Sequence, residues 1–381
     1  MEHDAVCGWK DRILLTPGPL TTSQTVKLAM LKDCGSREEE MIHTIRFIRK
    51  SILRLGKADK SQFTTILMQG SGTFGIEATL STVLSRKDKL LILINGSYGQ
   101  RIKQIANIQK IPYIVLEQKE HETIDPNKVD QLLTKNPHIT HVALVHCETT
   151  TGILNPITPI STVVKKHSKQ FIVDAMSSFG AVSIDVVQEQ IDYLISSSNK
   201  CLEGVPGFSF IIANKEHFIN CEGQATTLSL DLHHQWLGLE KNGQFRFTPP
   251  THVLLAFKQA LIELDQEGGI AGRKKRYQKN HQLLLEGMTK LNFKPYLTKD
   301  LQGWIITTFH NPTAPWFSFN EFYQELYNRG QVIYPGKLTH EDCFRVGNIG
   351  RIFAVDILNF LIIVKEITRN MQLNQDNPLN S

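Results

Sequence analysis

The chain has little net charge, no long apolar run and no paired cysteines, and each deficit excludes a class of protein. Its 42 Lys and Arg residues against 37 Asp and Glu residues leave +5 over 381 residues. This charge is too weak and too dispersed to indicate nucleic-acid binding, although it suits small anionic substrates. The longest apolar runs, such as residues 360–364, are far shorter than the ~20 residues that span a bilayer. The sequence therefore predicts neither a nucleic-acid nor a membrane partner.

The six cysteines are scattered and include no Cys-x-x-Cys pair. In a chain of this length, that spacing indicates reduced thiols rather than a disulfide framework. Residues 1–4 lack the cationic-then-apolar pattern of a secretory signal. We therefore expect a soluble, cytoplasmic protein.

Short apolar runs alternate with stretches of helical length through the first two thirds of the chain. Six such runs are rich in Ile, Val and Leu: residues 63–68, 90–94, 113–116, 141–145, 171–173 and 191–195. This alternation predicts an α/β fold with a mainly parallel sheet flanked by helices. The run 208–212 is a candidate for an added strand on that sheet.

The pattern changes after Pro250. Residues 252–291 have the pattern of a long helix that is broken at Gly268-Gly269. Then follow a strand-like run at 304–309, a helix that begins at Ser318, a second strand-like run at 331–334 and a closing helix near 354–371. We expect a large domain over 1–260, including the N-terminal segment, and a smaller α+β domain over 261–381.

A glycine-rich turn is the first candidate site. Residues 69–75 read Gln-Gly-Ser-Gly-Thr-Phe-Gly, after a predicted strand and before a predicted helix. Backbone N–H groups at such a helix start can hold a phosphate. The same residues match Gly-x-Gly-x-x-Gly, but the next strand ends in Asn95-Gly96, without the acid that a dinucleotide site needs. A nicotinamide dehydrogenase is therefore a distant alternative.

Two further candidates lie at predicted strand ends. Asp174 ends one apolar strand, and Lys200 follows the next after a run of serines and Asn199. A phosphate loop, an acid and a lysine in this order are the three anchors that pyridoxal 5′-phosphate requires. By contrast, His138, His141 and His146 lack the spacing of a zinc site, and we predict no bound metal. The basic run 273–276 reads as a solvated helix face.

At these motifs the chain resembles the class V aminotransferases, which are pyridoxal phosphate enzymes of fold type I. The resemblance runs from about Leu14 to Arg369, and two of its motifs look specific to the phosphonate branch of the family. Its landmarks are residues 15–22, 69–73, 146–152, 173–180, 196–200, 204–208, 228–232, 334–337 and 343–350.

The resemblance implies a role for each matching position. Lys200 and Asp174 would be catalytic, as the Schiff-base lysine and the partner of the pyridinium nitrogen. The other cofactor contacts would be Ser71, Gly72, Thr73, Tyr98, Thr149, Met176, Asn199 and Thr248, with Thr248 lent across a homodimer interface. The substrate would meet Gly18, Arg345 and, as a second anion contact, Arg37.

The implied activity is transfer of the amino group of 2-aminoethylphosphonate to pyruvate, giving phosphonoacetaldehyde and L-alanine in phosphonate degradation. An alanine–glyoxylate or serine–pyruvate transaminase is the alternative within the family. A non-catalytic binding protein on this fold is a more distant one. The trio Cys201-Leu-Glu203, directly after the lysine, departs from the one that close relatives often carry.

Overall fold

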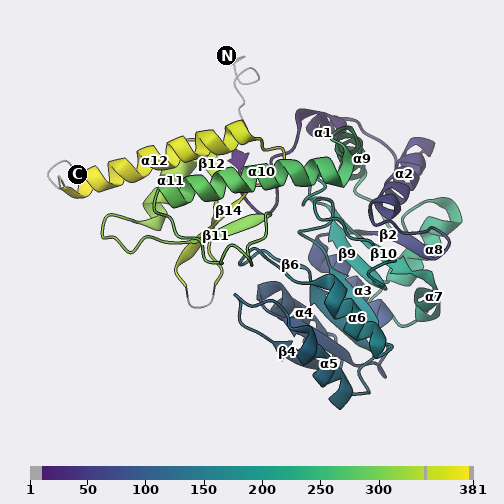
Figure 1. Ribbon diagram of the computed structural model, residues 1–381. Helices are drawn as coiled ribbons and strands as arrows, with labels where there is room; N and C mark the ends of the chain where they lie inside the picture. The colour runs from purple at the N-terminus through teal and green to yellow at the C-terminus, as the bar shows by residue number, and fades with distance from the viewer. Residues whose placement is uncertain (1–10, 339–340, 377–381) are drawn as a thin grey trace.

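The computed structural model describes residues 11–338 and 341–376. Figure 1 shows an α/β part and, beside it, a smaller part that is covered by two long helices, α10 and α12, lying side by side. The remaining residues of the two expected domains, 1–10, 339–340 and 377–381, lie outside the described ranges. Among the described helices, none combines the length and the apolar composition needed to cross a membrane.

A seven-stranded sheet forms the centre of the larger part, in the order β2-β10-β9-β8-β5-β3-β4. β10 is antiparallel to both of its neighbours, and the other neighbours pair in parallel. The six predicted runs and the added strand are all confirmed. The strands are β2 (Phe63–Gln69), β3 (Leu90–Ile94), β4 (Tyr113–Glu117), β5 (His141–Val145), β8 (Gln170–Asp174), β9 (Tyr193–Ser197) and β10 (Phe208–Asn214).

The strand sequences are apolar almost throughout because helices cover the sheet. All five residues of β3 are buried, as are all five of β5 and of β9. The helices of this part are α1 (Gln24–Leu28), α2 (Glu39–Leu55), α3 (Gly72–Val83), α4 (Ser97–Ile108), α5 (Pro126–Lys135), α6 (Ile157–Lys166), α7 (Lys215–Phe218), α8 (Leu232–Asn242) and α9 (Thr251–Gln266), with short 3₁₀ turns at Ala29–Leu31 and Ile219–Cys221.

The smaller part contains an antiparallel sheet in the order β11-β14-β13. Helices begin and end where the sequence predicts. Gly268 and Gly269 separate α9 from α10, the Ser318 hydroxyl accepts the Glu321 N–H at the start of α11, and Gly330 follows its end with φ +77°. The elements are α10 (Gly269–Lys290), β11 (Ile306–His310), α11 (Phe319–Asn328), β13 (Tyr334–Pro335), β14 (Cys343–Gly347) and α12 (Ala354–Asp376).

The N-terminal segment packs with the smaller part. β1 (Ile13–Leu14) pairs in parallel with β12 (Gln331–Val332), and Leu15 belongs to the hydrophobic cluster formed by α10, α11, α12 and β14. A larger cluster, which includes α9, fills the α/β part. We propose that these clusters are the cores of two domains divided near residue 260, and that the N-terminal segment joins them.

The basic run at the start of α10 is not the solvated face that its sequence suggests. Arg273 is completely buried, and the side chain of Arg276 is 11% exposed. Both arginines form ion pairs with Glu203 and Glu267, which come from other segments of the chain. The sequence could not predict this burial because the two compensating acids are not neighbours of the run on α10.

Gly75, the last glycine of the glycine-rich turn, lies where α3 rests on the sheet. A Cβ at this position would be 2.6 Å from Ser209 Oγ and 2.9 Å from Ser209 Cβ, on β10. We predict that Gly75→Ala lowers the stability by about 1–3 kcal/mol, because α3 must move off the strand. Thermal unfolding of Gly75→Ala, Ser209→Gly and the double variant would show recovery in the double variant. An unchanged melting temperature in Gly75→Ala would contradict the prediction.

Candidate active site

Six strands of the central sheet end at the same edge. β2 and β9 both run antiparallel to β10 and therefore point in the same direction, and β8, β5, β3 and β4 run parallel to β9. Polar residues follow five of these strand ends. They are Ser71 and Thr73 after β2, Tyr98 after β3, Thr149 after β5, Asp174 at the end of β8 and Lys200 after β9. The fold therefore brings the principal sequence-predicted residues to one edge, where α/β proteins bind their ligands.

The glycine-rich turn presents the start of α3 to this edge. Ser71 is the N-cap residue, yet its side chain makes no capping hydrogen bond. The Sδ atom of Met176 packs on Gly72 so closely that a Cβ there would lie 2.3 Å from it. Arg101 Nη1 donates to Thr73 Oγ1 at 3.4 Å, which adds a cation to the helix N-terminus. This arrangement suits a phosphate group.

Asp174 is a buried carboxylate, with 3% of its surface exposed. Its Oδ1 accepts the Met176 N–H at 2.9 Å. Burial raises the pKa of Asp174 to about 6, although the Met176 N–H and the charges of Arg101 and Lys200 oppose the rise. A buried carboxylate of this kind calls for a cationic partner.

Lys200 lies on the turn that follows β9. Its Nζ donates to the Pro17 carbonyl at 2.6 Å, and burial lowers the pKa of the ammonium to about 8. Gly18 has φ +114°, and a Cβ there would lie 2.8 Å from Lys200 Cδ. Glycine at this position therefore lets the N-terminal segment cover the lysine. The neighbouring Asn199 accepts a hydrogen bond from Ser197 Oγ through Oδ1 at 3.0 Å.

Glu148 holds the start of α4. Its carboxylate accepts the N–H of Gly99 at 2.9 Å and that of Tyr98 at 3.2 Å. Burial raises the pKa of Glu148 to about 7, while these two N–H groups act in the opposite direction. Arg101 lies one turn further along α4, with its guanidinium 4.9 Å from the centre of the Tyr98 ring. Glu148 therefore fixes the helix end that carries both side chains.

Thr149 and Arg345 meet at the boundary with the smaller part. Arg345 Nη1 donates to the Thr149 carbonyl at 3.0 Å, and its Nε donates to the Pro335 carbonyl at 3.1 Å. These bonds fix the plane of the guanidinium. Among the described residues, the buried Thr149 Oγ1 has no hydrogen-bond partner. Such an unsatisfied group indicates a ligand atom that it can bind.

Positive charge gathers on the side of Arg345. The pKa of Lys337 is lowered by burial and then by the positive charges of Arg345 and Arg101. The positive charge of these three residues makes this side of the candidate site favourable for an anion.

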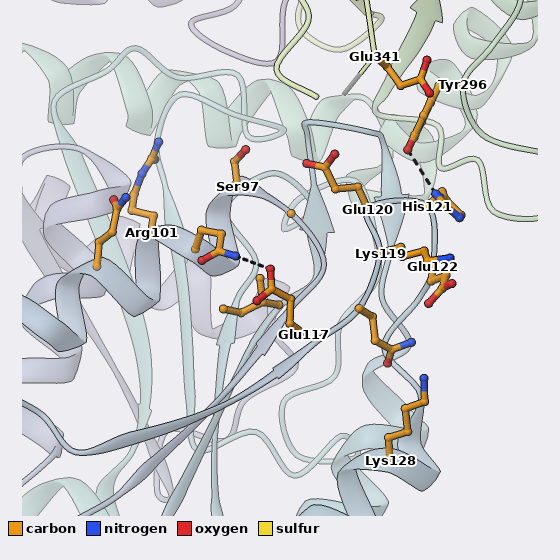
Figure 2. Close-up of a pocket in the computed structure, with 15 residues that line it drawn as sticks. Ser97, Arg101, Glu117, Lys119, Glu120, His121, Glu122, Lys128, Tyr296 and Glu341 are labelled. Carbon is orange, nitrogen blue, oxygen red and sulfur yellow. Dashed lines mark hydrogen bonds between the residues drawn. The ribbon is translucent and has the colours of Figure 1, made fainter. Parts of the chain in front are cut away.

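A pocket of about 1240 Å³ lies on the other side of α4 (Figure 2). Its lining shares Arg101 with the site, but four glutamates also line it: Glu117, Glu120, Glu122 and Glu341. Four of the lining groups are already paired with one another, since Gln100 Nε2 donates to Glu117 at 2.7 Å and the Tyr296 hydroxyl lies 3.4 Å from His121 Nδ1. Because these glutamates repel anions, an anionic substrate would bind more favourably on the Arg345 side of the site than in this pocket.

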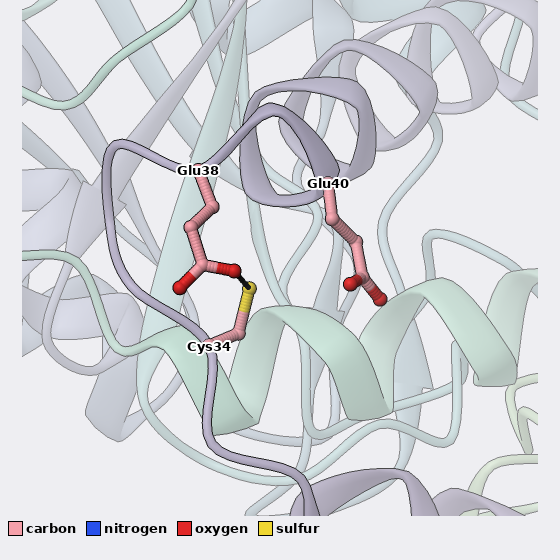
Figure 3. Close-up of side chains that lie close together, drawn as sticks. All are labelled: Cys34, Glu38 and Glu40. Atoms are coloured by element: carbon pink, nitrogen blue, oxygen red, sulfur yellow. Dashed lines mark hydrogen bonds between the residues drawn. The ribbon is translucent and has the colours of Figure 1, made fainter.

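One cluster of potential metal ligands occurs in the described ranges, formed by Cys34, Glu38 and Glu40 before and at the start of α2 (Figure 3). Burial and then the charges of the two glutamates raise the pKa of the Cys34 thiol, which is a poor ligand while protonated. The thiol donates to Glu38 at 3.7 Å, and Glu40 pairs with Lys32 at 2.5 Å. The three side chains therefore already have hydrogen-bond or ion-pair partners in the protein. The absence of a bound metal stays a prediction.

The three histidines considered as zinc ligands lie apart along β5. His141 begins the strand and His146 follows its end, so about five residues, or roughly 16 Å, separate them. His146 is buried and hydrogen-bonded to Ser178 Oγ through Nδ1 at 2.8 Å, whereas His138 is exposed.

Two predicted residues lie away from the cluster in this chain. Arg37 is exposed on the turn before α2. Thr248 lies at the outer side of the glycine-rich turn, where its carbonyl accepts a hydrogen bond from Gln69 Nε2 at 3.1 Å. The roles of both residues stay predictions. Conversely, two residues of the site, Arg101 and Glu148, were not predicted from the sequence, although Arg101 lies three residues after Tyr98 and Glu148 lies within the motif 146–152.

Comparison with known proteins gives consistent results. The family model for class-V aminotransferases matches residues 26–313. A 2-aminoethylphosphonate–pyruvate transaminase from Phocaeicola vulgatus is 50% identical over 94% of this chain and 99% of its own length. A second 2-aminoethylphosphonate–pyruvate transaminase, from Vibrio vulnificus, is 50% identical over 91% of this chain and 94% of its own length.

Solved structures share the fold at lower identity. The ureidoglycine–glyoxylate aminotransferase of Bacillus subtilis has a TM-score of 0.87 at 21% identity, covering 96% of this chain and 94% of that protein. The pyridoxamine–pyruvate aminotransferase of Mesorhizobium loti has a TM-score of 0.86 at 21% identity, covering 95% and 93%. At this identity the likeness extends to the fold alone.

Asp174 yields a prediction for the ligand-free protein. Its pKa is raised from 3.8 to about 6, so its favourable contribution is present below pH 4 and is lost between about pH 4 and 6. We predict that Asp174→Asn is more stable than the wild type at pH 8, by an amount on the order of 3 kcal/mol. Thermal unfolding from pH 4 to 8 would show the difference growing as the pH rises.

The half-buried Asp130 provides the matched control, since bonds to Lys166 and His167 lower its pKa. Asp130→Asn should give no such gain at pH 8. A lower melting temperature for Asp174→Asn than for the wild type across the whole pH range would contradict the prediction. It would mean that groups of the ligand-free protein already stabilise the charged carboxylate.

Proposed function

The chain belongs to the class-V aminotransferases, and we propose that it transfers the amino group of 2-aminoethylphosphonate to pyruvate, with pyridoxal 5′-phosphate as its cofactor. The products are phosphonoacetaldehyde and L-alanine, and the reaction belongs to phosphonate degradation. The 50% identity to relatives of this activity over nearly the whole chain supports the substrates. The single observation that carries the chemistry is the meeting of Asp174, Lys200 and the glycine-rich turn at one sheet edge.

The residues at this edge fit the cofactor. We propose that Ser71, Gly72, Thr73 and Asn199 hold its phosphate and that Asp174 pairs with its ring nitrogen. The Thr149 hydroxyl, which has no hydrogen-bond partner among the described residues, would bond the ring, and Tyr98 and Met176 would contact the ring. When bound, the cofactor supplies an aldehyde that exchanges amino groups and a ring that withdraws electrons.

Lys200 is the residue proposed to form the Schiff base and to move the proton. Because burial lowers its pKa to about 8, a useful fraction of its amine is neutral near neutral pH. The Pro17 carbonyl orients Nζ at 2.6 Å. With the cofactor bound, the neutral amine would take a proton from the amine-bearing carbon of the substrate and deliver it to the cofactor carbon that carried the aldehyde. Asp174 would keep the ring nitrogen protonated.

Arg345 is proposed to bind the anionic end of both substrates in turn. A guanidinium has five N–H donors, and the carbonyls of Thr149 and Pro335 use two of them. Its plane is thereby fixed, which suits two parallel bonds to a phosphonate or a carboxylate. Gly18 leaves room beside Lys200, and the neighbouring Lys337 and Arg101 add positive charge.

A homodimer is part of the proposal. Phe74 and Phe247 are 49% and 44% exposed on either side of Gln69, whose amide bonds the carbonyls of Phe247 and Thr248. Exposed aromatic side chains next to a ligand loop are typical of an interaction surface. A partner seated there would bring its own Thr248 near the phosphate loop of this chain.

The activity is tested by incubating the purified protein with pyruvate and a panel of amines and measuring alanine. We expect 2-aminoethylphosphonate to be the preferred donor. Lys200→Ala should lose several orders of magnitude in rate while keeping its circular dichroism spectrum and melting behaviour. Faster transfer from alanine to glyoxylate, or from serine to pyruvate, would replace the proposed substrates. Half of the wild-type rate in Lys200→Ala would remove the lysine from the reaction.

Arg345→Lys tests the anion site separately. Lysine offers a point charge in place of a planar pair of donors, so we expect higher KM values for both substrates and a loss of ~10²-fold in kcat/KM. The cofactor should stay bound, as judged from its absorbance on the purified variant. Unchanged KM values would assign Arg345 a structural role, and loss of the cofactor would make Arg37 the leading candidate.

A further inference from the structure

The turn that presents Lys200 is tied to α10 by a buried network of charges. The Glu203 N–H donates to the Lys200 carbonyl at 2.7 Å, which closes the turn, and the Glu203 side chain points into the protein with the residue 4% exposed. Its φ of +57° is unusual for a residue with a side chain. A strained and buried acid next to a reactive lysine indicates a constraint that the surrounding structure maintains.

Three side chains of α10 hold the Glu203 carboxylate. Tyr277 donates its hydroxyl to Oε1 at 2.5 Å, Arg276 Nη2 lies 2.7 Å from the same oxygen, and Arg273 Nη1 lies 3.4 Å from it. Arg273 Nη1 also donates to the Cys201 carbonyl at 2.6 Å. Both the backbone and the side chain of the lysine turn are therefore bonded to one helix of the smaller part.

The same helix is bonded to the segment that follows β14, the strand of Arg345. Tyr277 accepts the Gly350 N–H at 2.9 Å through its hydroxyl. Arg276 Nη1 donates to the carbonyls of Gly350 and Ile352, at 2.5 Å and 3.0 Å. Tyr277 and Arg276 thus connect the lysine turn with the loop after the proposed substrate-binding strand.

The charges of the network balance. Glu267, at the end of α9, accepts from Arg273 Nε at 2.7 Å and from Arg276 Nε at 2.6 Å. Two acids thus neutralise two buried arginines, as such burial requires. The two acids differ in position, however. Glu203 lies on the lysine turn, whereas Glu267 bonds the arginines from the end of α9, in a different segment of the chain.

We propose that Glu203 is a positioning residue, which holds the Lys200 turn against α10 so that the lysine amine has a fixed orientation at the active site. The proposal rests on the proposed function, in which Lys200 forms the Schiff base. It assigns a role to the trio Cys201-Leu-Glu203, which directly follows the lysine. The chemistry needs such support because sub-ångström displacement of a reacting group reduces the rate strongly.

The test compares Glu203→Gln with Glu267→Gln. Each variant removes one negative charge from the same pair of arginines, and only the first alters the lysine turn. Each holoprotein is assayed with 2-aminoethylphosphonate and pyruvate, well below its melting temperature. We expect kcat to fall about tenfold or more in Glu203→Gln and to stay within about twofold of wild type in Glu267→Gln, with the KM values of both variants nearly unchanged.

A second readout does not depend on turnover. Apoprotein is mixed with pyridoxal 5′-phosphate, and attachment to Lys200 is followed by absorbance and by mass after borohydride reduction. We expect slower attachment in Glu203→Gln and a wild-type rate in Glu267→Gln. Tyr277→Phe removes one donor to Glu203 and should shift both readouts in the same direction, so it serves as the test if Glu203→Gln does not fold.

Equal kcat values and equal attachment rates in Glu203→Gln and Glu267→Gln, with melting temperatures lowered alike, would overturn the proposal and leave the network a purely structural role. If Glu203→Gln does not fold, the proposal would also be overturned by equal kcat values and equal attachment rates in Tyr277→Phe and Glu267→Gln. Failure of the proposed function looks different, because the wild type itself would then form no alanine or would not attach the cofactor.

Discussion

The arrangement of the active site depends on placing a carboxylate and an amine out of water at the same sheet edge. Asp174 and Lys200 end or follow neighbouring parallel strands, and burial moves their pKa values in opposite senses, up to about 6 for the acid and down to about 8 for the lysine. Either shift disfavours the charged form, so folding alone gains nothing from these groups. They become favourable when a ligand supplies the partner that each lacks. This cost explains why the sheet around them is so thoroughly apolar.

The site also needs two segments from outside the α/β part, one near the start of the chain and one on β14. The N-terminal segment crosses the lysine through Pro17 and Gly18, and it reaches that position because β1 pairs with β12 in the smaller part. Arg345 arrives from β14 of the same part and bonds the Thr149 carbonyl of the larger one. The cofactor residues thus belong to the α/β part, while the proposed anion contact and the cover belong to the other. A change in the packing of the two parts would alter substrate binding before it altered cofactor binding.

The strands and their common edge could be predicted from the sequence because they depend on local apolar runs and on a rule of topology. Asp174 and Lys200 were predictable for the same reason, since strand ends mark where parallel strands present polar groups. The burial of Arg273 was not, because it depends on Glu203, which is 70 residues away in sequence, and on Glu267, which lies on the other side of the break between α9 and α10. Glu148 was missed for a related reason: its function is to bind the N-terminus of a helix that begins some fifty residues earlier. The sequence shows which residues are polar, but the partner that makes a polar residue necessary is usually non-local.

Two charge clusters in the described part of the chain follow opposite rules, and the contrast indicates which of them binds a ligand. Around Glu203 the charges cancel, with two arginines and two glutamates in mutual contact. At the active site they do not cancel, because four basic residues, Arg101, Lys200, Lys337 and Arg345, accompany two buried acids whose charged forms burial disfavours. Burial raises the pKa of Asp174 to about 6 and that of Glu148 to about 7. A protein that must fold without its ligand gains nothing from such an excess of positive charge. An anion with more than one negative charge removes the excess, and a phosphate group together with a phosphonate or carboxylate substrate has this property.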